Sequence, residues 1–312
     1  MRLVCEQHKH EAHFKAKNRN ETIDMITTNK NRKKICAANW KLFKNPQEAQ
    51  SFLTEWSSLV ANITNSKALN FTDTAIVINN MAETVIFPPA YNLPTLSDFT
   101  KKNPEEKRRV SFGPQNIYFK NDGAFTGEIS PLVVKEMGAK YALIGHSERR
   151  ALFHENDEFI SKKVKAAIDC GLVPLLCIGE SLFEREKGET LNVLARQISA
   201  GLSLVATELV EKLEGASSSQ FVPLVIAYEP VWAIGTGKVA SVKEVSEAHV
   251  AVRKYLDTTL SANIAAQTSI LYGGSVKPDN AKELASVEDV DGFLVGGASL
   301  KPKDFFAIYS VL

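Results

Sequence analysis

Glu229 is the side chain whose surroundings in this sequence point most directly to chemistry. It follows the apolar run 222–228 and precedes Pro230, which keeps the residue before it extended, so the carboxylate should lie where a buried strand becomes a loop. The loop begins with residues of restricted backbone conformation and continues with glycines, which adopt more conformations. This composition suits a hinged lid. We expect the lid to comprise Pro230, Val231, Trp232, Ala233, Ile234, Gly235, Thr236, Gly237 and Lys238. A carboxylate under such a lid could act as a general base; the alternative is a glycine-rich surface loop.

Other residues that could take part in catalysis or binding also follow apolar, strand-like runs: Asn39, Lys41, His146, Ser275, Gly296 and Gly297. His146 precedes Ser147 and Glu148, a sequence suited to opening a helix with Ser147 near the N-cap. The positive partial charge of a helix N-terminus disfavours a protonated imidazole. A neutral His146 could then donate a hydrogen bond to a carbonyl oxygen as negative charge develops on it. Taken singly, a histidine or lysine in such a place is more often structural.

Short apolar runs alternate with amphipathic segments of helical length. The runs are Ile35–Ala38, Thr84–Phe87, Val110–Phe112, Tyr141–Gly145, Val173–Ile178, Val222–Tyr228, Ile270–Tyr272 and Gly292–Val295. The helical segments include Pro46–Val60, Asp157–Cys170, Thr190–Leu213, Val242–Leu260 and Pro278–Ala285. Near-continuous apolar strands are typical of parallel sheets buried on both faces, so this order predicts an α/β fold, a single-domain (β/α)8 barrel. An open doubly wound sheet is the alternative, but its G-x-G-x-x-G fingerprint is absent after the first strand.

In a barrel, the polar residues named above all fall at the carboxyl ends of strands, the pole where barrel active sites are built. Seven motifs carry them in a fixed order along the chain. They are 38–41 (Ala-Asn-Trp-Lys), 123–128 (Gly-Ala-Phe-Thr-Gly-Glu), 144–150 (Ile-Gly-His-Ser-Glu-Arg-Arg), 177–180 (Cys-Ile-Gly-Glu), the lid, 272–276 (Tyr-Gly-Gly-Ser-Val) and 294–299 (Leu-Val-Gly-Gly-Ala-Ser). Together, over roughly residues 33–312, they resemble the triosephosphate isomerase family.

The resemblance implies a TIM barrel and an intramolecular oxidoreductase, an aldose–ketose isomerase of glycolysis and gluconeogenesis. Such an enzyme interconverts dihydroxyacetone phosphate and D-glyceraldehyde 3-phosphate through an enediol or enediolate, with no cofactor or metal. A metal is also unexpected from the residues, because the strand-end set holds one histidine and no clustered ligands. Two alternatives stay open: another phosphosugar barrel enzyme, such as an epimerase or aldolase, and a catalytically idle barrel that serves as a scaffold.

The resemblance also implies a role for each matching residue. Glu229 would be the base, His146 the neutral hydrogen-bond donor, a pairing for which this family is itself the standard example. Lys41 would supply positive charge, held by Glu148, and Asn39 a polar contact. Ser147 and Cys177 would support these residues. Backbone N–H groups would bind the substrate phosphate at Gly235, Ser275, Gly296 and Gly297, as expected for loops after the seventh and eighth strands.

A long connection after the third strand, residues 113–130, exceeds the usual length of such loops. In the family this loop inserts into a second subunit, which implies a homodimer and a dimer loop at Phe125, Thr126, Gly127 and Glu128. Thr126 would then lie near Asn39 and His146 of the other copy. The alternative is an ordinary surface loop.

Charge and cysteine content narrow the class of protein further. The net charge of +1 divides into +5 over residues 1–34 and −4 over the remainder, which argues against a nucleic-acid-binding core. No apolar run approaches the length of a membrane span. The four cysteines show no C-x-x-C spacing and are interpreted as reduced thiols, which indicates a cytoplasmic protein. Residues 1–32 are expected to form a disordered or peripheral extension to the catalytic barrel, 33–312.

Four features depart from the family pattern. One is the extension, and two are the longer stretches Asn62–Glu83 and Glu214–Gln220, which precede strands and should lie at the pole opposite the active site. The fourth is Pro114, which removes a backbone donor beside the proposed dimer loop and makes the packing of that loop uncertain.

Overall fold

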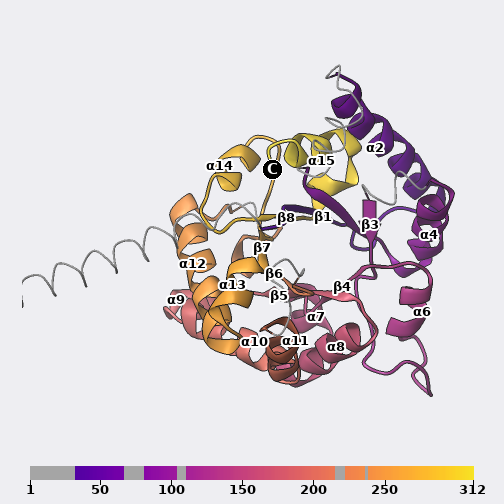
Figure 1. Cartoon of the computed structure of the whole chain (residues 1–312). Helices are drawn as coiled ribbons and strands as arrows, with labels where there is room; N and C mark the ends of the chain where they lie inside the picture. The colour runs from indigo at the N-terminus through magenta and orange to yellow at the C-terminus, as the bar shows by residue number, and fades with distance from the viewer. Residues whose placement is uncertain (1–31, 67–80, 104–109, 215–221, 236–237) are drawn as a thin grey trace, which may run out of the picture. The chain divides into compact units, whose positions relative to one another are not determined.

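The computed structural model describes residues 32–66, 81–103, 110–214, 222–235 and 238–312. Within this part of the chain, Lys33–Leu312 forms one compact unit. Eight parallel strands form its sheet, in the order β3-β2-β1-β8-β7-β6-β5-β4, and helices surround them (Figure 1). The predicted (β/α)8 barrel is confirmed. Residues 1–31, and most of the two longer stretches, lie outside the described residues.

The strands lie close to the predicted runs because each run is apolar on both faces. They are β1 (Ile35–Asn39), β2 (Glu83–Phe87), β3 (Val110–Phe112), β4 (Tyr141–Ile144), β5 (Val173–Ile178), β6 (Val225–Tyr228), β7 (Ser269–Tyr272) and β8 (Gly292–Val295). Five predicted boundaries are wrong: β1, β2 and β7 are each one residue longer than the predicted run, β4 is one residue shorter and β6 is three residues shorter. β4 ends before Gly145, whose φ is 70°. β6 begins after Pro223, because the Leu224 N–H bonds to the Val222 carbonyl at 2.8 Å and turns the chain there.

The helices follow the amphipathic segments less closely. They are α2 (Pro46–Ser66), α4 (Leu93–Lys102), α6 (Pro131–Glu136), α7 (Ser147–Leu152), α8 (Asp157–Asp169), α9 (Leu182–Glu186), α10 (Thr190–Leu202), α11 (Ala206–Glu214), α12 (Val242–Thr259), α13 (Ala262–Gln267), α14 (Ala281–Ala285) and α15 (Pro302–Tyr309). The single helix predicted over 190–213 is wrong: α10 and α11 meet at a bend of 73°. At the bend the Ser203 hydroxyl bonds to the Ala200 carbonyl at 2.8 Å and competes with the helical ladder.

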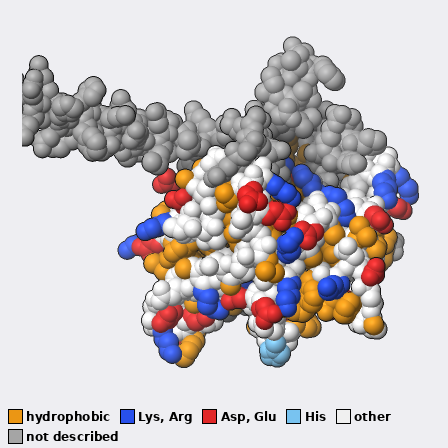
Figure 2. All heavy atoms as spheres, turned by 60° about the horizontal axis from the view of Figure 1, so that its bottom comes forward, with side chains coloured by type: hydrophobic (Ala, Val, Ile, Leu, Met, Phe, Trp, Pro, Cys, Tyr) orange, Lys and Arg blue, Asp and Glu red, His pale blue; other side chains and the backbone are white. Residues whose placement is uncertain are grey.

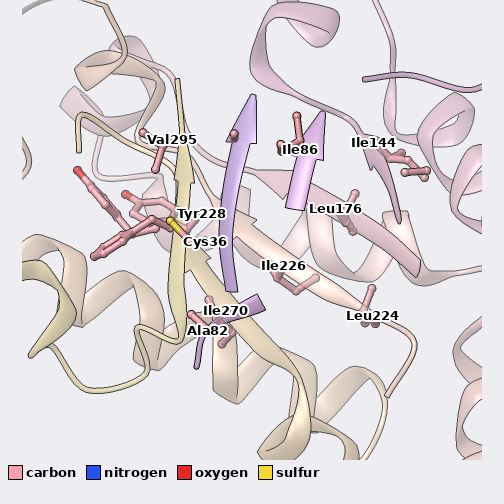
Figure 3. Packing of buried hydrophobic residues seen from close by; sticks show 14 of the residues in the cluster. Cys36, Ala82, Ile86, Ile144, Leu176, Leu224, Ile226, Tyr228, Ile270 and Val295 are labelled. Atoms are coloured by element: carbon pink, nitrogen blue, oxygen red, sulfur yellow. The ribbon is translucent and has the colours of Figure 1, made fainter. Parts of the chain in front are cut away.

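Side chains alternate along the strands between two buried clusters. One fills the barrel and includes Ala37, Phe87, Leu143 and Leu175. The other lies between strands and helices and includes Cys36, Ile86, Leu176 and Ile226, as Figure 3 shows. The rigid sheet between these clusters positions the loops at its carboxyl end. On the face shown in Figure 2, acidic and basic side chains are interspersed.

β3 and β4 close the barrel without a regular ladder. The Lys140 N–H bonds to the Phe112 carbonyl at 2.9 Å, and the Leu143 N–H bonds to the Pro114 carbonyl at 3.0 Å. Gly113 is required between them, because an added Cβ would lie 2.0 Å from the Tyr141 oxygen. Pro114 therefore takes part in the closure through its carbonyl, and its missing N–H removes neither of these bonds.

Among the described residues, no single helix is long and apolar enough to cross a membrane, although the bent pair α10 and α11 reaches that length and composition jointly.

Candidate active site

A cavity of about 250 Å³ opens at the carboxyl ends of the strands. It brings together the predicted catalytic set and the predicted phosphate-binding set. The lining residues include Asn39, Lys41, His146, Glu229, Ile234, Gly235, Ser275, Gly296 and Gly297. These residues come from the ends of strands β1, β4, β6, β7 and β8, so one fold feature, the parallel closure of the sheet, collects them.

Glu229 follows β6 directly and is almost completely buried, with 2% of its surface exposed. Its N–H bonds to the Ile178 carbonyl at 2.7 Å, which ties its backbone to β5. Gly179 gives it room, because an added Cβ there would lie 1.7 Å from the Glu229 carbonyl oxygen. The carboxylate is bonded at both oxygens: Oε1 lies 3.0 Å from His146 Nε2, and Oε2 accepts the Ser147 N–H at 2.9 Å.

These contacts keep the Glu229 carboxylate ionised although it is buried. Burial alone would raise its pKa, but His146, the Ser147 N–H and Lys41 together hold the pKa below its ordinary value. A carboxylate that is ionised, buried and shielded from water is suited to accept a proton from carbon.

His146 is itself the N-cap of α7, and Ser147, which was expected near the N-cap, directly follows it. The His146 Nδ1 accepts the Glu148 N–H at 3.2 Å, and Ser147 is the first residue of the helix. An Nδ1 that accepts a hydrogen bond carries no proton, so the geometry describes a neutral ring with its proton on Nε2. Nε2–H then donates to Glu229.

Two effects oppose each other at the His146 ring. Burial lowers its pKa, but the charge and hydrogen bond of Glu229 outweigh burial and raise the pKa above the ordinary value. The Glu148 N–H acts against protonation, since a protonated ring would place two donors face to face. Separation of His146 from Glu229 removes the main interaction that raises the pKa of His146, to which the charge of Glu148 also contributes.

Lys41 extends from the loop after β1 and pairs with Glu148, with 2.5 Å between Nζ and Oε1. Its φ is 50°, a left-handed conformation that costs a residue with a side chain about 1–3 kcal/mol. The Lys41 N–H bonds to Asn39 Oδ1 at 3.0 Å. Gln115 holds the same turn from the other side, because its Nε2 donates to the carbonyls of Lys41 and Phe87 at 2.8 Å each.

Gln115 is the positioning residue that the sequence-based predictions missed. It follows β3 closely, as Asn39 and Lys41 follow β1. The rule that polar residues after strands build the site could therefore have found it.

The base of the lid is firmly anchored. Trp232 Nε1 donates to Glu180 Oε1 at 2.8 Å, and the Arg185 guanidinium lies 4.3 Å from the centre of the Trp232 ring. Gly235 has a φ of 71°, which marks the more permissive part of the loop. Thr236 and Gly237 lie outside the described residues. Glu180 is completely buried. It belongs to the motif 177–180, but the sequence predicts no role for it.

Cys177 lies inside the barrel and is completely buried. Burial raises the pKa of its thiol, and the nearby Glu229 raises it further, so the thiol stays protonated. The dimer loop does not line the cavity of its own chain, and its Phe125 is 39% exposed. Among the described residues, no group of three His, Cys, Asp or Glu side chains is arranged to hold a metal ion.

The barrel and the polar cavity at its carboxyl pole define the class: a (β/α)8-barrel enzyme. Comparison with known proteins narrows the class. The family model described as triosephosphate isomerase matches residues 34–312. The chain is 43% identical over 277 residues to the triosephosphate isomerase of Citrifermentans bemidjiense, covering 89% of this chain and 98% of the relative. It is 46% identical over 265 residues to that of Coprinopsis cinerea, covering 85% and 92%.

A third relative, the triosephosphate isomerase of Bdellovibrio bacteriovorus, is 45% identical over 280 residues, covering 89% of this chain and 100% of its own. The chain belongs to the triosephosphate isomerase family. It is an isomerase of glycolysis with triosephosphate isomerase activity, and its substrates are triose phosphates. The resemblance stated from the motifs is thus confirmed, and the epimerase, aldolase and scaffold alternatives are set aside.

Proposed function

We propose that Glu229 carries out the isomerisation by moving a proton between the two adjacent carbons of dihydroxyacetone phosphate and D-glyceraldehyde 3-phosphate. The observation that carries this proposal is the contact between the buried Glu229 carboxylate and the His146 Nε2, 3.0 Å apart, in a cavity that Lys41 also lines. Removal of a proton next to the carbonyl leaves an enediolate. A proton then passes from the substrate hydroxyl oxygen to the former carbonyl oxygen, and Glu229 returns its own proton to the neighbouring carbon. A positioned base contributes about 10²–10⁴ in rate.

The substrate has to displace the contact that Glu229 makes with His146. One carboxylate oxygen then becomes free to reach a substrate carbon, and the His146 Nε2–H becomes free to donate to a substrate oxygen. The neutral ring is the form that this step requires, because a hydrogen bond to the developing oxyanion stabilises the enediolate. Lys41 adds a positive charge, with Glu148 holding its Nζ at 2.5 Å, and Asn39 adds a polar contact.

The far end of the cavity suits a phosphate group. Ser275, Gly296 and Gly297 line it, together with Gly235 of the lid. Backbone N–H groups in glycine-rich turns are ready donors to anions, so we assign phosphate binding to these four residues. Closure of the lid, with Ile234 over the site, would exclude water and protect the enediolate from loss of its phosphate.

The reaction redistributes hydrogen within one molecule, so an acid–base pair suffices for it and the proposal includes no cofactor or metal. Gluconeogenesis uses the same equilibrium in reverse. Cys36, Cys170 and Cys177 are unpaired. Free thiols and a glycolytic reaction support a cytoplasmic location, with no nucleic acid or membrane as partner.

We infer that the working form is a homodimer. Exposed apolar side chains lie on segments that follow strands at the active-site pole: Leu42 is 83% exposed, Phe43 55%, Phe125 39%, Leu152 69% and Phe153 62%. A second copy of the chain would cover these side chains. The dimer loop from Phe125 to Glu128, including Thr126 and Gly127, would reach the active site of that second copy.

The assay that tests the proposed role of Glu229 couples formation of dihydroxyacetone phosphate from glyceraldehyde 3-phosphate to a dehydrogenase. Glu229→Asp keeps the carboxylate but sets it back by one methylene, and a displacement of about 1 Å can cost about 10²-fold in rate. We expect kcat to fall by that order and KM to change little. A folded Glu229→Asp variant with the kcat of the unaltered chain would refute the role of Glu229.

A further inference from the structure

The cavity wall carries one charged residue that has no role in the mechanism above. Lys277 follows β7 and lines the cavity beside Ser275, Gly296 and Gly297. Lys277 is exposed, and within the described part of the chain it makes no ion pair. Lys41, which lines the same cavity, has its Nζ 2.5 Å from Glu148. Lys277 thus brings to the phosphate end a positive charge that no described carboxylate neutralises.

The backbone holds Lys277 in a fixed place at the edge of this cavity. The Lys277 N–H bonds to Asn280 Oδ1 at 2.8 Å, and the Asn280 Nδ2 donates to the Ser275 carbonyl at 3.0 Å. The Ala281 N–H, at the start of α14, bonds to the Lys277 carbonyl at 3.0 Å. Pro278 further restricts the residue before it to extended conformations. The side chain is exposed, and its point of attachment is fixed relative to Ser275.

A phosphate monoester dianion binds more tightly where a cation adds to the backbone donors. At neutral pH it carries about −1.5 to −2 charges. Glu229, ionised in the same cavity, repels it, and Lys41 is already paired with Glu148. We propose that Lys277 recognises the substrate phosphate, adding a charge that draws triose phosphates into the site and tightens their binding.

This inference rests on the proposed placement of phosphate at Ser275, Gly296 and Gly297. A hydrated, flexible ammonium acts at the rim through long-range attraction, which salt screens. Its effect therefore appears in KM and in the dependence on ionic strength, while kcat, which reports proton transfer at Glu229, stays the same.

The test compares Lys277→Gln with Lys282→Gln, which removes the same charge from an exposed position on α14 that does not line the cavity. Steady-state kinetics with glyceraldehyde 3-phosphate and inhibition by inorganic phosphate are measured at low and physiological ionic strength. For Lys277→Gln we expect KM and the inhibition constant of phosphate to rise about threefold to fivefold, as for an exposed charge interaction, with kcat unchanged. Kcat/KM should also depend less on salt, and Lys277→Arg should restore the original behaviour.

The outcomes separate this inference from the proposed function. If Lys277→Gln matches Lys282→Gln in every constant while the unaltered chain isomerises its substrate, the role of Lys277 is refuted and the function stands. If Lys277→Gln lowers kcat and leaves KM and phosphate inhibition unchanged, Lys277 does not act on the phosphate. If replacement of Ser275 by Pro, which removes its N–H, leaves KM unchanged, phosphate binds elsewhere and the proposed placement fails.

Discussion

Glu229 and His146 satisfy each other before any substrate arrives. Their contact helps to keep the base ionised in a buried site, and the Glu148 N–H on Nδ1 holds the imidazole proton on Nε2, the atom proposed to face the substrate oxygen. The arrangement costs little reorganisation, because the substrate replaces one hydrogen-bond partner of each group. At this scale the proposed chemistry depends on three side chains, Glu229, His146 and Lys41, and Lys41 is the one whose backbone is strained.

We predict that Gln115→Ala weakens catalysis without touching the substrate. The variant removes the donors to the carbonyls of Lys41 and Phe87, so the left-handed turn at Lys41 can relax and move its ammonium. Kcat should fall about tenfold, and stability by about 1–2 kcal/mol, measured by the coupled assay and by urea denaturation. Gln47→Ala, on the exposed face of α2, serves as the control. A kcat equal to that of the control would show that Lys41 holds its place unaided.

At the scale of elements, side chains help to close the barrel between β3 and β4, where the backbone hydrogen-bond ladder is irregular. Glu83 of β2 accepts hydrogen bonds from Ser111 of β3 and Tyr141 of β4 at 2.5 Å each, and from Lys140 at 2.7 Å. The carboxylate thus joins the two strands that share no regular pairing. Burial raises the pKa of Tyr141, so its hydroxyl remains a donor.

We predict that acid weakens this closure in a defined pH range. Burial opposes ionisation of Glu83, but Lys140 and Lys33 overcome it and lower its pKa from 4.5 to about 2. A lowered carboxyl pKa stabilises the fold fully above pH 4.5, and this contribution, about 3 kcal/mol, is lost as the pH falls toward 2. Burial also lowers the pKa of Lys140, which opposes part of this gain at high pH.

Glu83→Gln tests this account through urea denaturation at a series of pH values. The variant should be less stable by about 2–3 kcal/mol at neutral pH and should lose less stability on acidification below pH 4.5. Glu158→Gln, which removes an exposed carboxylate paired with Lys162 on α8, should leave the curve in place. Parallel curves for Glu83→Gln and the unaltered chain would contradict a closing role for Glu83.

At the scale of the whole molecule, the features that local sequence patterns determine could be predicted from the sequence. Apolar runs located the strands, and the position of polar residues after them located Glu229, His146 and Lys41 at one pole. Contacts between distant residues were not predictable. The place of Gln115 after β3 could mark it as a site residue, but its bonds to the Lys41 and Phe87 carbonyls, 74 and 28 residues away, could not be predicted. The bend between α10 and α11 interrupts a segment that is amphipathic throughout, so the pattern gave no sign of it. The positive φ of Lys41 could not be predicted from its residue type, and it is accompanied by bonds from its N–H to Asn39 and from Gln115 to its carbonyl.

The proposed dimer is also a property of the whole molecule. We predict that Phe43→Asp shifts the chain from dimer to monomer and lowers activity, because burial of a charge against a second copy is costly. Leu204→Asp, at an equally exposed apolar side chain in the bend between α10 and α11, is the control: Leu204 is 49% exposed and Phe43 55%. Sedimentation equilibrium and activity measured over a dilution series would decide, and a fully active monomer would refute the requirement for a partner.

The proposed isomerisation depends most on Glu229 as the group that takes the proton from carbon. The direct measurement follows, by proton NMR, the entry of deuterium from heavy water into the carbon-bound positions of the triose phosphates. We expect Glu229→Gln, which keeps the shape of the side chain, to lose exchange and isomerisation together by about 10²–10⁴-fold. Exchange at the rate of the unaltered chain in a folded Glu229→Gln protein would show that another group removes the proton.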